Sequence, residues 1–126
     1  MKSVWIIDDD RSIRWVLEKA LTREGIEFKS FSMADDALRA LGHETPQVVV
    51  SDIRMPGSSG LDFLQTLHQR QPHIPVIIMT AYSDLESAVS AFQGGAFEYL
   101  PKPFDINHAI ELIRRAIEQS KRKSGV

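Results

Sequence analysis

The chain has 126 residues, with 15 Lys and Arg against 17 Asp and Glu, no cysteine and a formal net charge of -2. This length supports one domain with one hydrophobic core, and the 43% hydrophobic and 25% charged fractions are those of an ordinary globular domain. The charge balance excludes the basic surface of a nucleic-acid-binding domain, and the lack of cysteine excludes disulfides, thiolate metal sites and a cysteine nucleophile.

The apolar runs of the chain are short. The longest, residues 4–7 and 76–79, fall far below the roughly 20 residues that a membrane span needs. Three aspartates follow the first run directly, which makes it too short for a signal peptide. We therefore expect a cytoplasmic protein without membrane contact, and the absence of cysteine fits a reducing compartment.

Strand and helix patterns alternate along the whole chain. Continuous or alternating apolar runs predict strands at residues 4–7, 26–31, 47–51, 76–80 and 98–100. Apolar residues at helical spacing predict helices around 13–21, 32–41, 61–67, 84–92 and 105–120. Gly25, Gly42 and the pair Gly94 and Gly95 are predicted to end three of these helices. Ser32 with Asp35, and more strongly Ser83 with Glu86, resemble capping boxes.

Five strand and helix units in strict alternation predict an α/β fold, a doubly wound parallel sheet with helices on both faces. The apolar first, third and fourth strands suit the centre of the sheet, whereas the second, charged at Glu27 and Lys29, and the short fifth suit its edges. The strand order 2-1-3-4-5 satisfies both conditions. We expect one domain over residues 1–120, and the basic segment 121–126 as the start of a linker.

Polar residues follow the predicted strands at the points where the carboxyl ends of a parallel sheet meet, which is where ligands bind in such folds. They are Asp8, Asp9 and Asp10 after the first strand, Asp52 after the third, Thr80 at the fourth and Lys102 after the fifth. Carboxylates about 4 Å apart repel by about 4 kcal/mol per pair at an effective dielectric of about 20, so this cluster favours a cation. Oxygen ligands without His or Cys favour Mg²⁺.

A carboxylate beside such a cation can act as a nucleophile toward a phosphoryl group and form an aspartyl phosphate. Lys102 would then pair with the phosphoryl charge, and Thr80 would donate its hydroxyl to a phosphoryl oxygen. Each residue also has a simpler explanation when taken alone. Asp10 reads as a cap of the first helix, Asp52 and Lys102 as turn residues, and Thr80 as an ordinary strand residue. Only their convergence at one sheet edge favours a common site.

Four segments together resemble the receiver domain of two-component response regulators, over nearly the whole chain. They are Ile-Ile-Asp8-Asp9-Asp10, Ser51-Asp52-Ile-Arg-Met-Pro56-Gly57, Met79-Thr80-Ala81 and Leu100-Pro101-Lys102-Pro103-Phe104. The stretches Ser12-Ile-Arg-Trp15-Val-Leu-Glu and Ser83-Asp-Leu-Glu-Ser-Ala-Val-Ser-Ala-Phe92 further resemble the nitrogen regulatory protein C family of sigma-54-dependent transcription activators. The resemblance implies a flavodoxin-like fold.

The receiver resemblance implies a role for each residue at the predicted sheet edge. Asp52 is the implied phosphoacceptor, with Asp9, Asp52 and the Arg54 carbonyl as direct Mg²⁺ ligands. Asp8 is implied to bind Mg²⁺ through water, and Lys102 to neutralise the phosphoryl group. Thr80 is the implied switch hydroxyl and Tyr99 the aromatic side chain that responds to it, although Tyr99 also reads as an ordinary edge-strand residue.

The same resemblance implies partners. A sensor histidine kinase would donate the phosphoryl group, and the full-length protein would carry C-terminal ATPase and DNA-binding output domains, with a receiver homodimer as a further contact. The domain would be no enzyme beyond catalysing its own phosphorylation and dephosphorylation. We expect helix 84–92, the fifth strand and the last helix to form the phosphorylation-dependent face, with the alternative that the helix's apolar stripe is simply core. We also expect a cis Lys102-Pro103 bond.

Three other functions remain to be compared with this one. A Mg²⁺-dependent phosphohydrolase of the haloacid dehalogenase type would carry an acid two residues after its nucleophile, where this chain has Arg54. A nucleotide or flavin carrier would need a glycine-rich turn in place of the three aspartates. An interaction module that is never phosphorylated would not need Asp52, Thr80 and Lys102 together. Histidines 43, 68, 73 and 108 show no metal-binding spacing.

Overall fold

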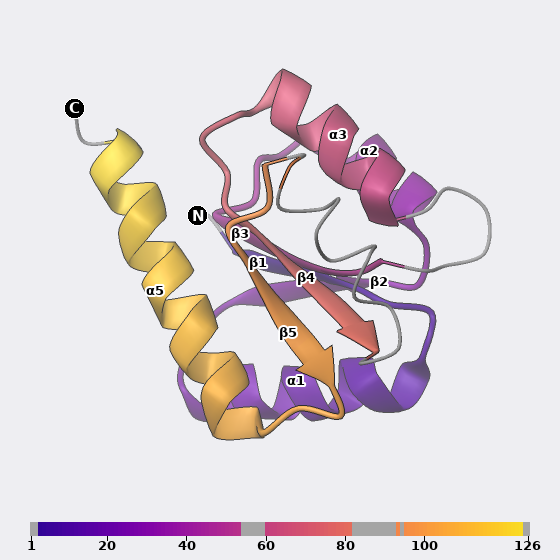
Figure 1. The fold of residues 1–126 in the computed structure, drawn as a ribbon, viewed down its shortest axis with the longest axis vertical. Coiled ribbons are helices and arrows are strands. Elements are labelled where there is room, and N and C mark those ends of the chain that lie inside the picture. Colours follow the sequence, from indigo (N-terminus) through magenta and orange to yellow (C-terminus); the bar gives the residue numbers. More distant parts are fainter. Residues whose placement is uncertain (1–2, 54–59, 82–92, 94, 125–126) are drawn as a thin grey trace.

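The structure, a computed structural model, describes residues 3–53, 60–81, 93 and 95–124. They form a parallel sheet in the order β2-β1-β3-β4-β5, as predicted (Figure 1). The strands are β1 (Val4–Ile7), β2 (Phe28–Phe31), β3 (Val48–Asp52), β4 (Val76–Ala81) and β5 (Glu98–Lys102). The helices are α1 (Arg11–Arg23), α2 (Ala34–Leu41), α3 (Gly60–Arg70) and α5 (Ile106–Ser124). The helix predicted at 84–92 lies outside the described residues.

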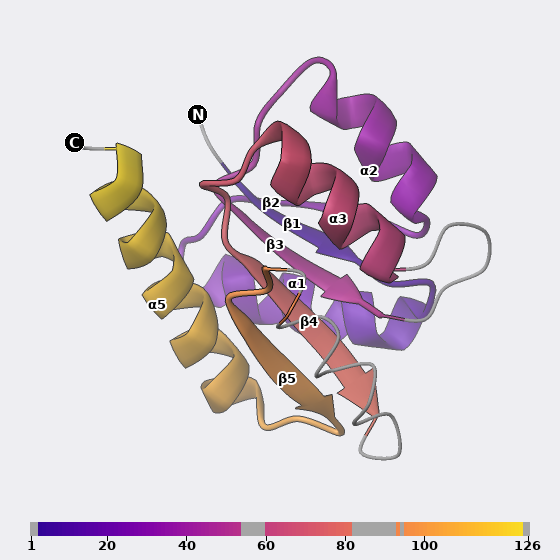
Figure 2. The ribbon, with the colours of Figure 1, turned by 45° about the horizontal axis from the view of Figure 1, so that its top comes forward.

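Helices cover both faces of the sheet, with α1 and α5 on one face and α2 and α3 on the other (Figures 1 and 2). Alternate residues of each strand supply the two cores, because successive side chains of a strand point to opposite faces. Ile6 packs in the core under α1 and α5, whereas its neighbours Trp5 and Ile7 pack in the core under α2 and α3. The two-sided covering explains why the first and third strands read as continuous apolar runs.

The sheet edges follow the predicted distribution of charge. All residues of β1 and β3 are buried, whereas Lys29 on β2 is exposed and most of β5 is half-buried. Among the residues that the structure describes, no helix is both long enough and apolar enough to cross a bilayer.

Several predicted boundaries differ from the structure by one residue or more. The second strand begins at Phe28 rather than at residue 26, because Gly25 at φ 70° ends α1 and the Ile26 N–H still bonds to the Leu21 carbonyl at 2.9 Å. The capping box of Ser32 with Asp35 is wrong. Met33 is the N-cap of α2 and gives no side-chain cap, so Ser32 stands one residue too early to reach the first turn.

The last helix is also longer than predicted. It continues to Ser124 rather than ending at residue 120, so the first part of the segment expected to begin a linker is helical. Lys and Arg in this segment have good helix propensity and favour the negative end of the helix dipole, and neither property is visible in the spacing of apolar residues. Whether a linker follows stays a prediction.

Candidate functional site

The end of β1 and the end of β3 bring two aspartates side by side. Ile7 pairs with Ser51 in the parallel register, so the next residue of each strand, Asp8 and Asp52, lies level with the other. Asp8 is fully buried, and Asp52 keeps only 12% of its side chain exposed. Two adjacent buried carboxylates are costly unless a cation or hydrogen-bond donors compensate them.

Lys102 at the end of β5 supplies that compensation. Its Nζ donates to Asp8 Oδ2 at 2.8 Å and lies 3.4 Å from Asp52 Oδ2, so one ammonium bridges both carboxylates. The second oxygen of Asp8 accepts the Asp10 backbone N–H at 2.9 Å. The Lys102-Pro103 peptide bond is cis, as the sequence predicted. Residues 94 positions apart in the sequence thus share one charged cluster, which confirms the convergence expected from the fold.

The environment of Lys102 changes its acidity. Burial acts against the charged form of the amine, but the hydrogen bond to Asp8 and the negative charges of Asp8 and Asp52 together outweigh it. The pKa of Lys102 is therefore raised above the ordinary value of 10.5. Lys102 is a permanent cation at neutral pH, placed where added negative charge would be held.

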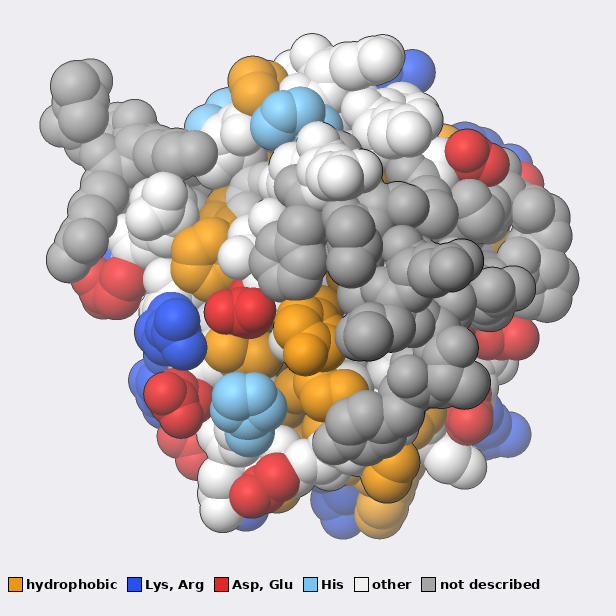
Figure 3. All heavy atoms as spheres, in the orientation of Figure 1, with side chains coloured by type: hydrophobic (Ala, Val, Ile, Leu, Met, Phe, Trp, Pro, Cys, Tyr) orange, Lys and Arg blue, Asp and Glu red, His pale blue; other side chains and the backbone are white. Residues whose placement is uncertain are grey.

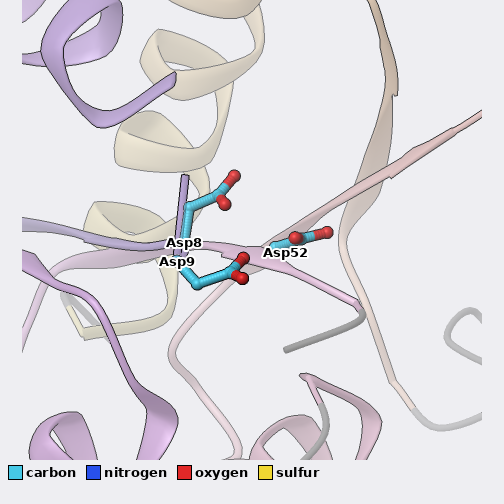
Figure 4. Close-up of side chains that lie close together, drawn as sticks. All are labelled: Asp8, Asp9 and Asp52. Atoms are coloured by element: carbon cyan, nitrogen blue, oxygen red, sulfur yellow. The ribbon is translucent and has the colours of Figure 1, made fainter. Parts of the chain in front are cut away.

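The carboxylate of Asp9 completes an all-oxygen cluster. Asp8, Asp9 and Asp52 each place an oxygen such that the three lie within 4.8 Å of one another. Figure 4 shows the Asp9 carboxylate turned toward Asp52. Asp9 is exposed, whereas Asp8 is buried and already bound by Lys102 and the Asp10 N–H. Hard oxygen donors in this arrangement could hold a metal ion, and the exposed Asp9 is more accessible to it than the buried Asp8.

The turn from β1 into α1 holds the acidic residues in place. Asp10 is the N-cap of α1, because its Oδ1 accepts the N–H groups of Ser12 at 2.8 Å and Ile13 at 3.4 Å, which confirms its predicted capping role. Sequence reasoning missed Arg14, whose Nη1 donates to the Asp8 carbonyl at 2.6 Å. The spacing from Asp10 places Arg14 one helical turn after the cap, but the spacing alone does not show which carbonyl the side chain reaches.

Thr80 and Tyr99 occupy neighbouring strands beside the cluster. Thr80 is buried on β4 and pairs with Pro101, and Ile78 pairs with the half-buried Tyr99. Because side chains two residues apart share a face of the sheet, Thr80 and Tyr99 project from the same face. The remaining candidate, the Arg54 carbonyl, lies outside the described residues.

The sequence and the fold of this chain are matched by known proteins. Residues 4–114 match the family described as "Response regulator receiver domain". The chain belongs to this family. A relative of the receiver is "DNA-binding transcriptional regulator NtrC" of Salmonella typhimurium, 58% identical over 114 residues, which are 90% of this chain and 24% of that protein. The receiver therefore spans about a quarter of the length of the curated relatives that it matches.

Solved structures agree with the fold and with the subfamily. The solution structure of the apo receiver domain of nitrogen regulatory protein C has a TM-score of 0.85 and 56% identity, with coverage of 93% of this chain and 94% of that chain. The crystal structure of the receiver domain of NtrX from Brucella abortus has a TM-score of 0.88 and 33% identity, with coverage of 92% and 98%. This receiver belongs with those of the nitrogen regulatory protein C type.

Proposed function

We propose that Asp52 is the phosphoacceptor of this receiver. The observation that carries the proposal is the position of its carboxylate, which lies 3.4 Å from Lys102 Nζ and within reach of the exposed Asp9 at the open edge of the sheet. In the reaction, an Asp52 oxygen attacks the phosphorus of a phosphohistidine on a sensor histidine kinase. The new O–P bond forms as the P–N bond breaks, and the imidazole leaves.

The acidic residues fit a Mg²⁺ ion, which Asp9, Asp52 and the Arg54 carbonyl would bind directly and Asp8 would bind through water. When bound, Mg²⁺ neutralises the carboxylates and the oxygens of the incoming phosphoryl group. The buried Asp8 has a second task in this arrangement, because its hydrogen bond from Lys102 holds the ammonium beside Asp52. Thr80 donates its hydroxyl to a phosphoryl oxygen once Asp52 is modified.

Phosphorylation signals only if it favours one of two arrangements of the domain. We infer that Thr80 moves toward the phosphoryl group and that Tyr99, on the same face of the next strand, fills the vacated space. Helix 84–92, which lies outside the described residues, β5 and α5 then form the altered face. Figure 3 shows hydrophobic side chains beside α5, with charged side chains among and around them. An attached ATPase and DNA-binding region, or a second receiver, would bind there and couple the switch to sigma-54-dependent nitrogen regulation.

Intact mass spectrometry tests the chemistry directly. The protein is incubated with a small phosphodonor and Mg²⁺, and we expect the gain of one phosphoryl group. Asp52→Asn should abolish the gain, whereas Asp62→Asn, at an exposed carboxylate on α3, should retain it. Phosphorylation that continues in Asp52→Asn, or that proceeds equally well in excess chelator, would contradict the proposal.

Backbone amide shifts test the switch separately. Beryllofluoride, a mimic of the phosphoryl group, should perturb the amides around Asp9, Asp52 and Lys102 and also residues 84–99. If the perturbation stops at the first group, Asp52 is still a phosphoacceptor, but the proposed face does not change.

A further inference from the structure

The side chain of Arg14 ties the first turns of α1 to the acidic edge of the sheet. Its Nη1 donates to the Asp8 carbonyl at 2.6 Å, and the residue is half-buried. The backbone N–H of the same residue bonds to the Asp10 carbonyl at 3.2 Å in the first turn of the helix. The backbone bond is the ordinary first hydrogen bond of α1, so it is the side chain of Arg14 that joins the helix to Asp8, the residue directly after β1.

The carbonyl that Arg14 binds belongs to the peptide unit that leads into Asp9. A peptide unit is planar, so the Asp8 carbonyl and the Asp9 N–H turn together. The residues on either side are already fixed. The Asp8 N–H bonds to the Phe31 carbonyl at 3.1 Å, and the Asp10 N–H bonds to Asp8 Oδ1 at 2.9 Å. The Arg14 contact fixes the orientation of the plane between them, and this orientation sets the direction in which the Asp9 side chain leaves the backbone.

Asp9 is the residue of the cluster that most needs this support. Its carboxylate is exposed and faces other carboxylates within 4.8 Å, so electrostatic repulsion pushes it toward solvent in the absence of a cation (Figure 4). Asp8 and Asp52, by contrast, are held by Lys102. The guanidinium also brings a positive charge to the acidic edge while forming its hydrogen bond with a backbone oxygen rather than with a carboxylate.

We propose that Arg14 is a positioning residue for divalent-cation binding and phosphoryl transfer, which acts by holding the Asp8–Asp9 peptide so that the Asp9 carboxylate faces Asp52. The inference rests on the proposed function of the cluster. A residue that only anchors α1 would affect the stability of the domain but not its affinity for a cation. A residue that positions Asp9 would affect that affinity.

The test compares Arg14→Gln and Arg14→Lys with matched changes at Arg11, which is exposed in the first turn of the same helix. Mg²⁺ alone is titrated into each phosphate-free protein, and binding is followed by the amide shifts of Asp9 and Asp52. We expect R14Q to weaken Mg²⁺ binding about tenfold, the lower end of the usual effect of removing a group that orients a metal ligand. R14K, which keeps the charge and a donor, should retain part of the affinity, and R11Q should match the wild type.

Phosphorylation by a small phosphodonor supplies the second readout. The R14Q rate should fall at low Mg²⁺ and recover toward the wild-type rate at saturating Mg²⁺. If R14Q lowers the unfolding midpoint but binds Mg²⁺ as R11Q does, Arg14 is only a structural anchor and the proposal is overturned. If R14Q does not fold, the Mg²⁺ affinity of R14K is compared with that of R11K instead, and equal affinities overturn the proposal. If the wild type binds Mg²⁺ but is never phosphorylated, the proposed function fails, while the Mg²⁺ titration still tests Arg14.

Discussion

Ion pairs at the carboxyl edge of the sheet differ from those on the outer surface of the domain. At the edge, Lys102 keeps 21% of its side chain exposed and pairs with the fully buried Asp8. On the surface, Lys29 and Glu44 form a pair at 2.5 Å, but their side chains are 50% and 45% exposed. Similar distances therefore occur in very different surroundings, and charges interact more strongly where water is excluded.

The two regions also differ in charge balance. The exposed pair matches one cation with one anion, whereas at the edge Lys102 pairs with both Asp8 and Asp52, and oxygens of these two and of Asp9 lie within 4.8 Å of one another. A cluster of carboxylates that is only partly exposed to water is poor for stability, and it is the arrangement expected where a protein reserves a site for a ligand that neutralises the charge. Removing a charge at the edge should therefore change the unfolding free energy more than removing one on the surface, and at the edge the change can also be stabilising.

Removal of the edge lysine should have the largest effect on stability. We expect Lys102→Met to lower the unfolding free energy by about 2 kcal/mol, somewhat below the usual cost of leaving a fully buried charge unpaired, because Asp8 would still accept the Asp10 N–H. Lys29→Met, the matched change in the exposed pair, should cost no more than about 0.5 kcal/mol. Urea denaturation at pH 7 without Mg²⁺ measures both. Equal losses would show that burial does not separate the two regions.

A change of Asp9 should have the opposite sign. Without Mg²⁺, Asp9→Asn should raise the unfolding free energy, because it removes one of three repelling carboxylates. We expect a gain of only about 1 kcal/mol, because the exposure of Asp9 weakens that repulsion. Added Mg²⁺ should stabilise the wild type by mass action and the variant much less, so the difference shrinks or reverses. Thermal unfolding with and without Mg²⁺ follows this crossover. A variant that is destabilised in both conditions would contradict the idea of a strained metal-free cluster.

The sequence was sufficient for the architecture and for most of the site because both depend on strong local signals. Apolar runs and helical periodicity predicted the strand order, and the topology then placed Asp8, Asp52 and Lys102 together although they are distant in the chain. The Asp10 cap was predicted for the same reason, since it directly precedes α1.

Features that depend on the exact path of the backbone could not be predicted. Ser32 and Asp35 have the residue types of a capping box, but α2 begins at Ala34 and leaves the serine one residue away from the capping position. The role of Arg14 depends on which way a single carbonyl points, and no periodicity contains that information. The wrong capping box at Ser32 and the missed contact of Arg14 have the same cause. A helix that begins one residue later, or a peptide plane that turns, leaves the hydrophobic pattern of the sequence unchanged.

The titration of Lys102 should make the unfolding free energy depend on pH in the alkaline range. A lysine whose pKa is raised in the folded state stabilises the protein fully below its ordinary value of 10.5, and this contribution is lost as the pH rises through the folded value. The unfolding free energy should therefore fall with increasing pH above about 10 more steeply in the wild type than in Lys102→Arg, whose guanidinium stays charged. Urea denaturation across this range measures the slopes, and parallel curves would show that Lys102 is not stabilised as a cation.

The smallest effect is expected at the exposed contact between α1 and α5. There a hydrogen bond from Arg114 to Glu24 lowers the pKa of the Glu24 carboxyl from its ordinary 4.5, while partial desolvation opposes the change. A carboxylate with a lowered pKa adds stability above its ordinary value and loses it as the pH falls through the folded value. Arg114→Gln should return the Glu24 pKa toward 4.5, and so should about 1 M salt, where the screening length is about 3 Å.

Carbon NMR of the Glu24 carboxyl measures this titration, with Arg115→Gln as the control, because Arg115 lies on the same helix but pairs with Glu98 and Glu111. Salt should not release Lys102 in the same way, since its partner Asp8 has no contact with solvent through which ions could screen the pair. A Glu24 pKa that resists salt as Lys102 does would mean that exposure does not set the strength of these pairs, and that the acidic edge is not electrostatically distinct from the rest of the surface.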